Sequence, residues 1–395
     1  MSQSEPQIVQ LQADSKDAQG KKVLKDKLKV GIVGATGMVG QQLIRMLKDN
    51  PWFEITKLAA SAGSAGKTYL DSVAGRWFMD FAVPPAVGAL TVVDADNLDL
   101  VVEGVDIVFC AVSLDKASVL KLEDELAKRG VFVTSCNSAN RMDPLVPMMI
   151  PAANANHLKV MEQQRRARGY TTGAIIVKSN CSIQSYVIAL TPLKEFGIKQ
   201  IFVHSEQALS GAGKTFTTWP EMVENVIPYI GGEEQKSEQE PLKVWGDIGA
   251  SGISHASLPK IHAKCVRVAV ADGHTAYVSA QLENAIDSAT ILKAWQEFKG
   301  VSGDLSTLPS APEQIIHFQQ AADRPQPKLD VMTENGMAVT TGQLSVNEDW
   351  VRFTALAHNA ILGAAGGAVL ATELAVAQGC VYRRVAAKTP AVSVG

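Results

Sequence analysis

Apolar residues in the first half of the chain fall into short strand-like runs that alternate with stretches of helical spacing. The run 29–33 leads into a glycine-rich turn, and Val39, Leu43 and Leu47 beyond it recur on one face of a helix. Further strand-like runs are 55–60, 91–93, 105–112, 131–135 and 174–177, with a helical segment at 116–129. Strands that alternate with helices predict an α/β fold with a Rossmann-type, doubly wound parallel sheet.

The second half of the chain has a different pattern. Longer strand-like runs with partial alternation lie at 200–204, 276–282, 337–346 and 350–357, which predicts a second α+β domain with a mostly antiparallel sheet. Residues 233–240 are charged and are expected to be exposed, and the proline-containing stretch 309–328 is expected to be a long loop. The Ala- and Gly-rich segment 358–378 is helical in pattern and is expected to pack back onto the first domain.

Length and composition limit the range of functions. A chain of 395 residues exceeds what one core usually serves, and 46% hydrophobic with 19% charged residues is typical of a globular protein. The net charge of −3, from 37 basic and 40 acidic residues, gives no electrostatic case for nucleic acid or an anionic membrane. No apolar run reaches the roughly 20 residues that span a bilayer.

The cysteines and the N-terminal stretch indicate a location. Five widely spaced cysteines without a CxxC favour a reduced compartment over a disulfide framework. Residues 1–27 are polar, lack the apolar core of a signal peptide and contain acids that argue against a transit peptide. We therefore expect a disordered extension over 1–27 and a cytoplasmic protein.

The first strand ends in a variant of the dinucleotide-binding fingerprint. Its glycines, Gly34, Gly37 and Gly40, permit a tight turn and leave a helix N-terminus free to hold a pyrophosphate. Thr36, Met38 and Val39 complete this predicted cofactor loop. The second strand ends without the acid that usually binds NAD ribose hydroxyls, and the loop after it offers side chains for a 2′-phosphate. These are Ser61, Ser64 and Lys67, and they favour NADP over NAD.

A cysteine follows the last strand of the first half. Cys181 lies at the start of the amphipathic segment 183–196, where a helix N-terminus would favour the thiolate and would offer backbone N–H groups to an oxyanion. His274, in a strand that runs into a glycine turn, is the best candidate base. A buried free cysteine and a turn histidine are the plainer interpretations of each residue alone. His255, His262 and Cys265 lack a fourth ligand and zinc spacing, so no metal is expected.

Four motifs in one order make the assignment more specific. Residues 34–40, 179–182, 207–213 and 267–274 together resemble the aspartate-semialdehyde dehydrogenase family, in the branch found in archaea and fungi. The likeness runs from about residue 28 to about residue 383. It implies an NADP-binding domain at 28–178, completed by a C-terminal helix at 358–385. It also implies a catalytic and dimerisation domain at 179–357.

The resemblance implies a role for each matching residue. Cys181 would be the nucleophile, His274 the general acid/base, and Asn180 with the Cys181 N–H would bind the oxyanion. The other implied substrate residues are Gln207 for the acyl group, Arg267 for the α-carboxylate, Glu233 for the amino group, and Lys236 and Arg141 for phosphate. Ser210, Gly211 and Asn359 would contact the cofactor. For Glu233, Lys236 and Arg141, a solvated surface charge is the alternative.

The implied reaction is reduction of L-4-aspartyl phosphate by NADPH to L-aspartate 4-semialdehyde and phosphate, through a Cys181 thioester. It belongs to lysine, threonine, methionine and isoleucine biosynthesis. Homodimers or homotetramers are implied, and the few charges at 337–346 suggest the interface. Gly63 stands where this branch has an arginine for the 2′-phosphate, which makes NAD possible. A malonyl-CoA reductase of the same fold and a catalytically silent nucleotide-binding protein are the alternatives.

Overall fold

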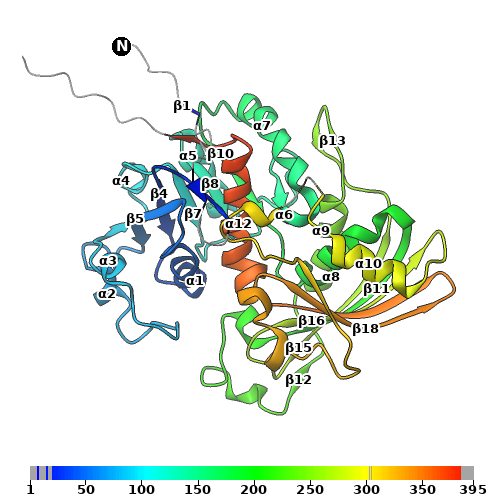
Figure 1. Ribbon diagram of the computed structural model, residues 1–395. Coiled ribbons are helices and arrows are strands. Elements are labelled where there is room, and N and C mark those ends of the chain that lie inside the picture. The colour runs from blue at the N-terminus through cyan, green and yellow to red at the C-terminus, as the bar shows by residue number, and fades with distance from the viewer. Residues whose placement is uncertain (1–6, 9–14, 17–19, 302, 304, 384–395) are drawn as a thin grey trace, which may run out of the picture.

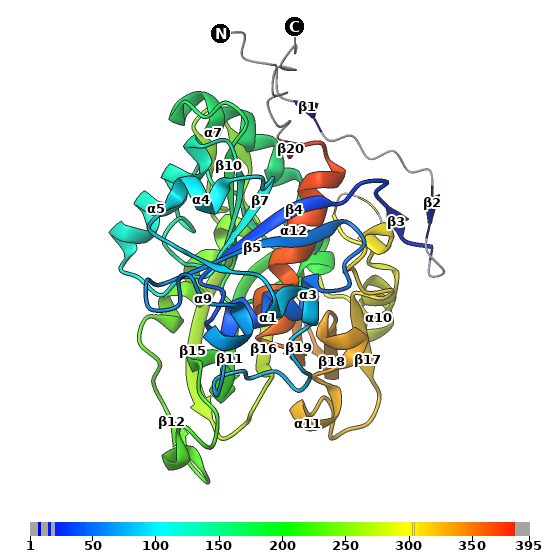
Figure 2. The ribbon, with the colours of Figure 1, turned by 90° about the vertical axis from the view of Figure 1, so that its left-hand side faces the viewer.

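Two seven-stranded sheets, with the buried helix α12 (Gly366–Ala377) between them, make up most of the described structure (Figure 1). The structure is a computed structural model, and it describes residues 7–8, 15–16, 20–301, 303 and 305–383. The red helix α12 (Gly366–Ala377) runs between the blue-to-green first sheet and the green-to-orange second sheet. Figure 2 shows the same helix behind the strands of the first sheet.

The first sheet confirms the predicted doubly wound fold. Its strands are β4 (Leu28–Val33), β5 (Phe53–Ala60), β6 (Val92–Asp94), β7 (Ile107–Cys110), β8 (Phe132–Ser135), β9 (Met148–Met149) and β10 (Ala174–Lys178). Every pairing is parallel, in the order β6-β5-β4-β7-β8-β10-β9. The chain reverses its direction of travel between β4 and β7, and ligands bind at such switch points in open α/β sheets.

Short helices flank this sheet. The longest are α1 (Met38–Leu47), α5 (Lys116–Lys128) and α7 (Met161–Arg168). The others are single turns or little more: α2 (Tyr69–Ser72), α3 (Pro85–Gly88), α4 (Leu98–Val102) and α6 (Pro151–Asn154). The helices predicted after β4 and before β8 are therefore present at the expected places.

The second sheet is mixed and mostly antiparallel, as predicted. Its strands are β11 (Ile198–Gln207), β12 (Val226–Ile227), β15 (Lys260–Val268), β16 (His274–Leu282), β17 (Ile316–Gln319), β18 (Val339–Asn347) and β19 (Trp350–Ala357). Only the β11–β15 and β17–β18 pairs are parallel. Helices α8 (Gln184–Leu190) and α10 (Ser288–Glu297) pack on this sheet, and α11 (Pro327–Asp330) lies beyond β17.

Four sequence expectations need correction. Residues 233–240 are not an exposed charged stretch, because they begin α9 (Glu233–Val244), whose Glu233, Ser237 and Glu240 are buried. The segment 183–196 is not one amphipathic helix: every residue of α8 is buried, and a 3-10 helix (Thr191–Phe196) with exposed Lys194 and Glu195 follows it. The stretch 309–328 contains β17, which extends the second sheet. Leu24 belongs to the core, so the predicted disorder fails over 20–27.

Three small two-stranded pairs complete the described structure. Two lie near the chain ends: β1 (Gln7–Ile8) with β20 (Tyr382–Arg383), and β2 (Ser15–Lys16) with β3 (Lys22–Val23). The third, β13 (Ile248–Gly249) with β14 (Gly252–Ile253), lies in the second half of the chain. The rest of the predicted extension, and the last two residues of the predicted helix 358–385, lie outside the described residues.

Helix α12 returns to the first sheet, as its pattern predicted. A π-helical turn (Ile361–Ala365) precedes it, and Thr372 hydrogen-bonds Thr134 of β8 at 2.7 Å. The next residue, Glu373, is fully buried and accepts hydrogen bonds from Asn50 Nδ2 at 2.7 Å and from Ser310 N at 2.9 Å. Burial raises the pKa of Glu373 from 4.5 to about 7, although these hydrogen bonds oppose the rise.

We expect Glu373 to make stability fall between about pH 4.5 and 7. The folded chain holds a proton that the unfolded chain releases over this range, so stability is lost as pH rises toward the folded pKa. A shift from 4.5 to about 7 corresponds to about 3 kcal/mol. Glu373→Gln stays neutral, so urea unfolding should find it gaining up to that amount on wild type between pH 5 and 8. The exposed Glu297→Gln should show no such gain, and an equal effect of Glu373→Gln at both pH values would refute the assignment.

Candidate active site

The predicted nucleophile and its predicted base are neighbours in the structure. Cys181 lies in the turn between β10 and α8, so it precedes a helix N-terminus as expected. His274 is the first residue of β16, and its Nε2 lies 3.4 Å from Cys181 Sγ. Two residues 93 positions apart are therefore within contact distance at the junction of the two sheets.

The proton of His274 has a defined location. The backbone N–H of Ala208 donates to His274 Nδ1 at 3.1 Å, so the neutral ring carries its proton on Nε2, which faces Cys181. Burial, together with Arg267, lowers the pKa of His274 to about 3, which keeps the ring neutral at physiological pH. In this tautomer Nε2–H is a hydrogen-bond donor, which does not fit the role of an acid/base at Nε2 that was predicted from the sequence.

The thiol of Cys181 is not activated in the way that the sequence suggested. Burial raises the pKa of Cys181 above its ordinary value of 9.0. Lys178 lowers the pKa, Glu233 raises it, and Arg141 and Arg267 lower it. The shift is therefore opposite to the one expected from a helix N-terminus, because the desolvation of Cys181 was not visible in the sequence.

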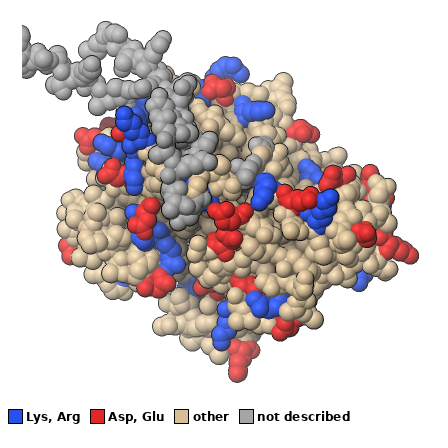
Figure 3. Space-filling view, in the orientation of Figure 1, with Lys and Arg blue, Asp and Glu red and all other residues tan. Residues whose placement is uncertain are grey.

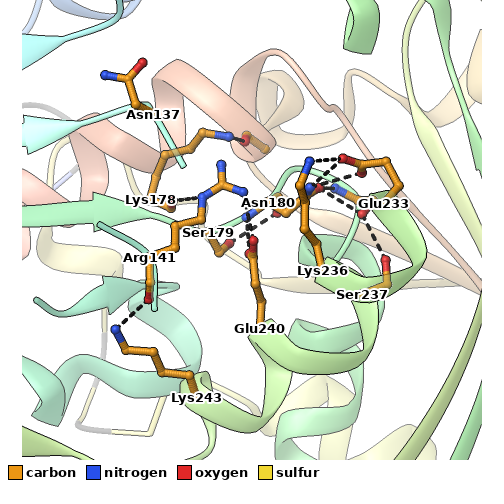
Figure 4. A network of polar contacts seen from close by, with 12 residues as sticks. Asn137, Arg141, Lys178, Ser179, Asn180, Glu233, Lys236, Ser237, Glu240 and Lys243 are labelled. Atoms are coloured by element: carbon orange, nitrogen blue, oxygen red, sulfur yellow. Dashed lines mark hydrogen bonds and ion pairs between the residues drawn. The ribbon is translucent and has the colours of Figure 1, made fainter. Parts of the chain in front are cut away.

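Glu233 joins several predicted residues into one network (Figure 4). Its carboxylate accepts hydrogen bonds from Asn180 Nδ2 at 3.0 Å, Gln207 Nε2 at 3.3 Å and Lys236 Nζ at 2.7 Å. Burial raises the pKa of Glu233, but hydrogen bonds from Lys236, Asn180 and Gln207 outweigh it and hold the pKa below 4.5. Glu233 is thus a buried carboxylate close to Cys181, and the surface-charge alternative is wrong for it.

Strand register brings the predicted acyl and carboxylate ligands together. Gln207 and Arg267 are direct partners in the parallel β11–β15 pair. Arg267 is buried and donates through Nη1 to the carbonyl of Ala208, the residue that also orients His274. A Cβ on Gly211 would lie 2.8 Å from the His274 ring and 3.0 Å from Arg267 Nη1, so this position is closely surrounded by the candidate catalytic groups.

Sequence reasoning singled out Arg141 but missed two charged residues close to the cysteine turn, Lys178 and Glu240. Arg141 is buried, with Nη1 2.8 Å from Glu240 and Nε 3.1 Å from the Lys178 carbonyl. Glu240 also accepts from the backbone N–H of Asn180 at 2.6 Å. Lys178 is buried too, and its Nζ donates to the Gly363 carbonyl. The i, i+7 spacing of Glu233 and Glu240, and a lysine in an apolar strand, were the signals available.

The glycine loop fits a dinucleotide. Gly34 has φ +86°, and a Cβ there would lie 2.3 Å from the Ala111 carbonyl at the end of β7; a Cβ on Gly40 would lie 2.4 Å from the Gly34 carbonyl. Gly37 caps α1 without a side-chain hydrogen bond, and its own Cβ position meets only one atom, at 3.5 Å. The helix N-terminus at the sheet's switch point is therefore open to an anion, with Thr36, Met38 and Val39 beside it.

The remaining cofactor residues form two groups. Ser61, Ser64 and Lys67 lie in the loop after β5, where Lys67 Nζ donates to the Gly63 carbonyl at 2.8 Å. Asn359 Nδ2 donates to Ser210 Oγ at 2.8 Å, and Asn359 Oδ1 accepts from the N–H of Gly273 beside His274. The first group lies where a Rossmann-type fold is expected to bind the adenosine half of a dinucleotide. The second group lies beside the candidate catalytic pair, Cys181 and His274.

Two kinds of feature are absent from the described part of the chain. No group of three or more His, Cys, Asp or Glu residues in it is arranged to hold a metal ion. Among the same residues, no helix combines the length and the apolar character needed to cross a membrane.

Comparisons with known proteins agree with this geometry. Residues 29–161 match the semialdehyde dehydrogenase NAD binding domain, and residues 190–362 match the semialdehyde dehydrogenase dimerisation domain. An aspartate-semialdehyde dehydrogenase from Archaeoglobus fulgidus is 38% identical over 88% of this chain and 97% of its own length. One from Methanothermobacter thermautotrophicus is 39% identical over 87% of this chain and 98% of its own.

Solved structures give the same result. A crystal structure of aspartate semialdehyde dehydrogenase with NADP from Candida albicans has a TM-score of 0.79 and 33% identity, covering 89% of this chain and 99% of that one. A Vibrio cholerae structure, at 24% identity and a TM-score of 0.68, shares the fold. The chain belongs to the aspartate-semialdehyde dehydrogenase family.

Proposed function

We propose that the protein is an NADP-dependent aspartate-semialdehyde dehydrogenase. It converts L-4-aspartyl phosphate to L-aspartate 4-semialdehyde and phosphate, reversibly, in the biosynthesis of lysine, threonine, methionine and isoleucine. The observation that carries the proposal is the 3.4 Å contact between Cys181 Sγ and His274 Nε2 inside a cage of Glu233, Gln207 and Arg267. We assign cofactor binding to residues 28–178 with 358–385, and catalysis to residues 179–357.

The chemistry begins at Cys181. Its sulfur attacks the acyl carbon of aspartyl phosphate and forms a thioester, and the carbon–oxygen bond to phosphate breaks. The thiol proton passes to the departing phosphate, which leaves as hydrogen phosphate, and the negative charge that develops on sulfur is favoured electrostatically by Lys178, Arg141 and Arg267. Arg141 and Lys236 lie where they can receive the departing phosphate, and the Nη2 of Arg141 has no hydrogen bond among the described residues.

NADPH, when bound, supplies the hydride that reduces the thioester. Gly34, Gly37, Gly40 and the N-terminus of α1 would hold its pyrophosphate, and Ser210, Gly211 and Asn359 its nicotinamide end. His274 Nε2–H then donates a hydrogen bond to the oxyanion of the tetrahedral adduct on Cys181, with the Cys181 N–H as a second donor. When the adduct releases the aldehyde, the Cys181 thiolate takes a proton from solvent. The side-chain amide of Asn180 already donates to Glu233, so Asn180 holds that carboxylate in place and does not itself bind the oxyanion.

Substrate recognition is assigned to three buried groups. Arg267 binds the α-carboxylate with the donors left free by its bond to Ala208, and Gln207 orients the acyl group. Glu233, whose pKa lies below 4.5, is negatively charged at neutral pH and binds the α-ammonium. A buried carboxylate at this place favours an amino-acid substrate over a malonyl thioester, because malonyl-CoA carries no ammonium to pair with it.

The proposed reaction is tested by following reduction of NADP at 340 nm with aspartate 4-semialdehyde and phosphate, with NAD in parallel. Phosphate-dependent reduction of NADP is expected. Oxidation of NADPH by malonyl-CoA, without activity on aspartate 4-semialdehyde, would assign the chain to the alternative reductase. Cofactor binding without any turnover would indicate a silent nucleotide-binding protein.

Cys181→Ser should reduce turnover by about 10³-fold or more, because the hydroxyl is a much weaker nucleophile at neutral pH. Binding of NADPH, measured by fluorescence titration, should be unchanged. Cys380→Ser is the matched control, since Cys380 is a free and partly exposed cysteine that is not among the candidate site residues. Residual turnover of Cys181→Ser near the wild-type rate would remove Cys181 from the nucleophile's role.

The alkylation of Cys181 should depend on pH in one step. Because burial raises the pKa of the thiol above 9.0, the rate with iodoacetamide should rise only at alkaline pH. No step near pH 6.5 is expected, since the pKa of His274 is about 3. Glu233→Gln removes a negative charge and should move the profile toward lower pH. A wild-type midpoint well below 9, read by mass spectrometry of the peptide, would contradict this picture.

We propose that the protein is a homodimer, since one face of the second sheet remains uncovered. Phe202 is 44% exposed and stacks on His262 at 4.9 Å, and Tyr277 is 43% exposed beside it. The stretch suggested by sequence, 337–346, is largely internal, because the first four residues of β18 are buried. On the face of the molecule that Figure 3 shows, positive and negative side chains are interspersed, which supports the expectation of no nucleic-acid partner.

Phe202→Asp should convert the dimer to monomer in sedimentation velocity, because a carboxylate would be buried without a partner. Leu100→Asp is the control, since Leu100 is equally exposed on α4 of the first domain and should leave the sedimentation coefficient unchanged. A Phe202→Asp protein that sediments as wild type would exclude this face.

A cytoplasmic location is proposed on the five free cysteines, which suit a reducing compartment.

A further inference from the structure

The loop after β5 has an arginine that the sequence did not point to. Arg76 lies twelve residues after Ser64, beyond α2, and its Nη2 donates to Ser64 Oγ at 3.2 Å. Gly63, next to Ser64, has no heavy atom within 4 Å of its Cβ position, so that side of the loop is open. A guanidinium therefore reaches the loop from outside it, beside the position where the sequence has no arginine.

The guanidinium of Arg76 is held in place by its own helix turn. Nε donates to the Ser72 carbonyl at 2.8 Å and Nη2 to the same oxygen at 2.6 Å. Nη1 has no hydrogen bond among the described residues, and no carboxylate there forms an ion pair with Arg76. The side chain is exposed. It therefore presents a fixed positive charge with free donors to solvent.

The backbone of Arg76 is tied to the glycine loop. Gln41, buried on α1 one residue after Gly40, donates through Nε2 to the carbonyls of both Thr36 and Arg76, at 3.1 and 2.9 Å. Gln41 Oε1 accepts from the N–H of Phe78 at 2.8 Å. Tyr69 adds a second tie, since its hydroxyl donates to the Ala35 carbonyl at 2.8 Å. The loop that would hold the pyrophosphate thus sets the position of Arg76.

The place is where a dinucleotide-binding fold distinguishes its two cofactors. An acid at the end of the second strand binds the ribose hydroxyls of NAD, whereas a nearby arginine accommodates the 2′-phosphate of NADP. Here the second strand, β5, ends in Ala59 and Ala60, and no acid follows before Asp71. The carboxylate of Asp71 accepts from Thr68 Oγ1, at the N-cap of α2.

We propose that Arg76, together with Ser64 and Lys67, binds the 2′-phosphate and gives this chain its preference for NADP. Arg76 would make the contact with the 2′-phosphate that an arginine at position 63 would make, but from the segment after α2 and not from the loop after β5. Lys67, whose Nζ holds the Gly63 carbonyl, adds a second positive charge to the loop. The inference rests on the proposed function, since it assigns one end of the cofactor used by that reaction.

Binding of fragments tests this without turnover. Titration calorimetry with adenosine 2′,5′-bisphosphate and with AMP separates the 2′-phosphate from the rest of the nucleotide. Arg76→Gln should raise the Kd for the bisphosphate about 10- to 100-fold, the usual loss for hydrogen bonds to a charged group. The Kd for AMP should stay within about twofold. Arg166→Gln, an exposed arginine on α7, is the charge-matched control and should change neither value.

A rescue makes the test specific to the phosphate. In the Arg76→Gln protein, Gly63→Arg should restore most of the affinity for the bisphosphate and for NADPH, because a side chain at Gly63 meets no neighbour. Equal losses for AMP and the bisphosphate, or no loss beyond that of Arg166→Gln, would overturn the assignment of Arg76.

The two proposals fail separately. If Arg76→Gln keeps the wild-type preference for NADPH over NADH, the assignment of Arg76 is wrong and the proposed reaction stands. A wild-type protein that prefers NADH also overturns the assignment, and turnover of aspartate 4-semialdehyde with NAD then preserves the reaction. A wild-type protein that binds neither NADPH nor NADH refutes the proposed function itself.

Discussion

The candidate active site depends on two carboxylates on one face of α9 that hold a single residue, Asn180. Glu240 accepts the backbone N–H of Asn180, and Glu233 accepts its side-chain amide. Asn180 Oδ1 in turn accepts from the N–H of Ser182, so the turn that contains Cys181 is fixed on both sides. A buried carboxylate costs several kcal/mol unless it is paired, and here each pairs with a cation, Arg141 or Lys236. Helix α9 and the cysteine turn therefore hold each other in position.

The same arrangement explains why the two sheets must meet with little freedom. Cys181 follows a strand of the first sheet, whereas His274, Gln207 and Arg267 come from three strands of the second. A Cβ on Gly363, in the π-helical turn before α12, would lie 2.8 Å from Cys181 Cβ. That turn therefore packs against the nucleophile, and α12 continues from it to the first sheet. Cys181, His274 and the glycine loop therefore lie on elements that share one continuous hydrophobic core.

The sequence predicted those features that depend on neighbours along the chain. The strand, glycine turn and helix at residues 28–47 were predictable because apolar spacing and glycine chemistry are local. The buried face of α9 was not, because seven of its first eight residues are charged or amide-bearing, and the partners of the buried ones, Asn180 and Arg141, are distant in sequence. The pKa of Cys181 was predicted in the wrong direction for the same reason: a helix N-terminus is visible in sequence, whereas desolvation by a second domain is not. Arg76 escaped notice because its contacts with Ser64 and with Gln41 depend on the folded chain and not on spacing along the sequence.

The raised pKa of Cys181 also affects how fast its thiol is oxidised by peroxide. Peroxide attacks the thiolate, not the thiol, and converts it to sulfenic acid and then to forms that reductants do not restore. A resting site that keeps its sulfur protonated reacts slowly with peroxide. Substrate brings a carbon electrophile to the sulfur and forms the thioester at once. Desolvation therefore makes the Cys181 thiol a weak nucleophile when no substrate is bound, and the same effect protects the thiol from oxidation between turnovers.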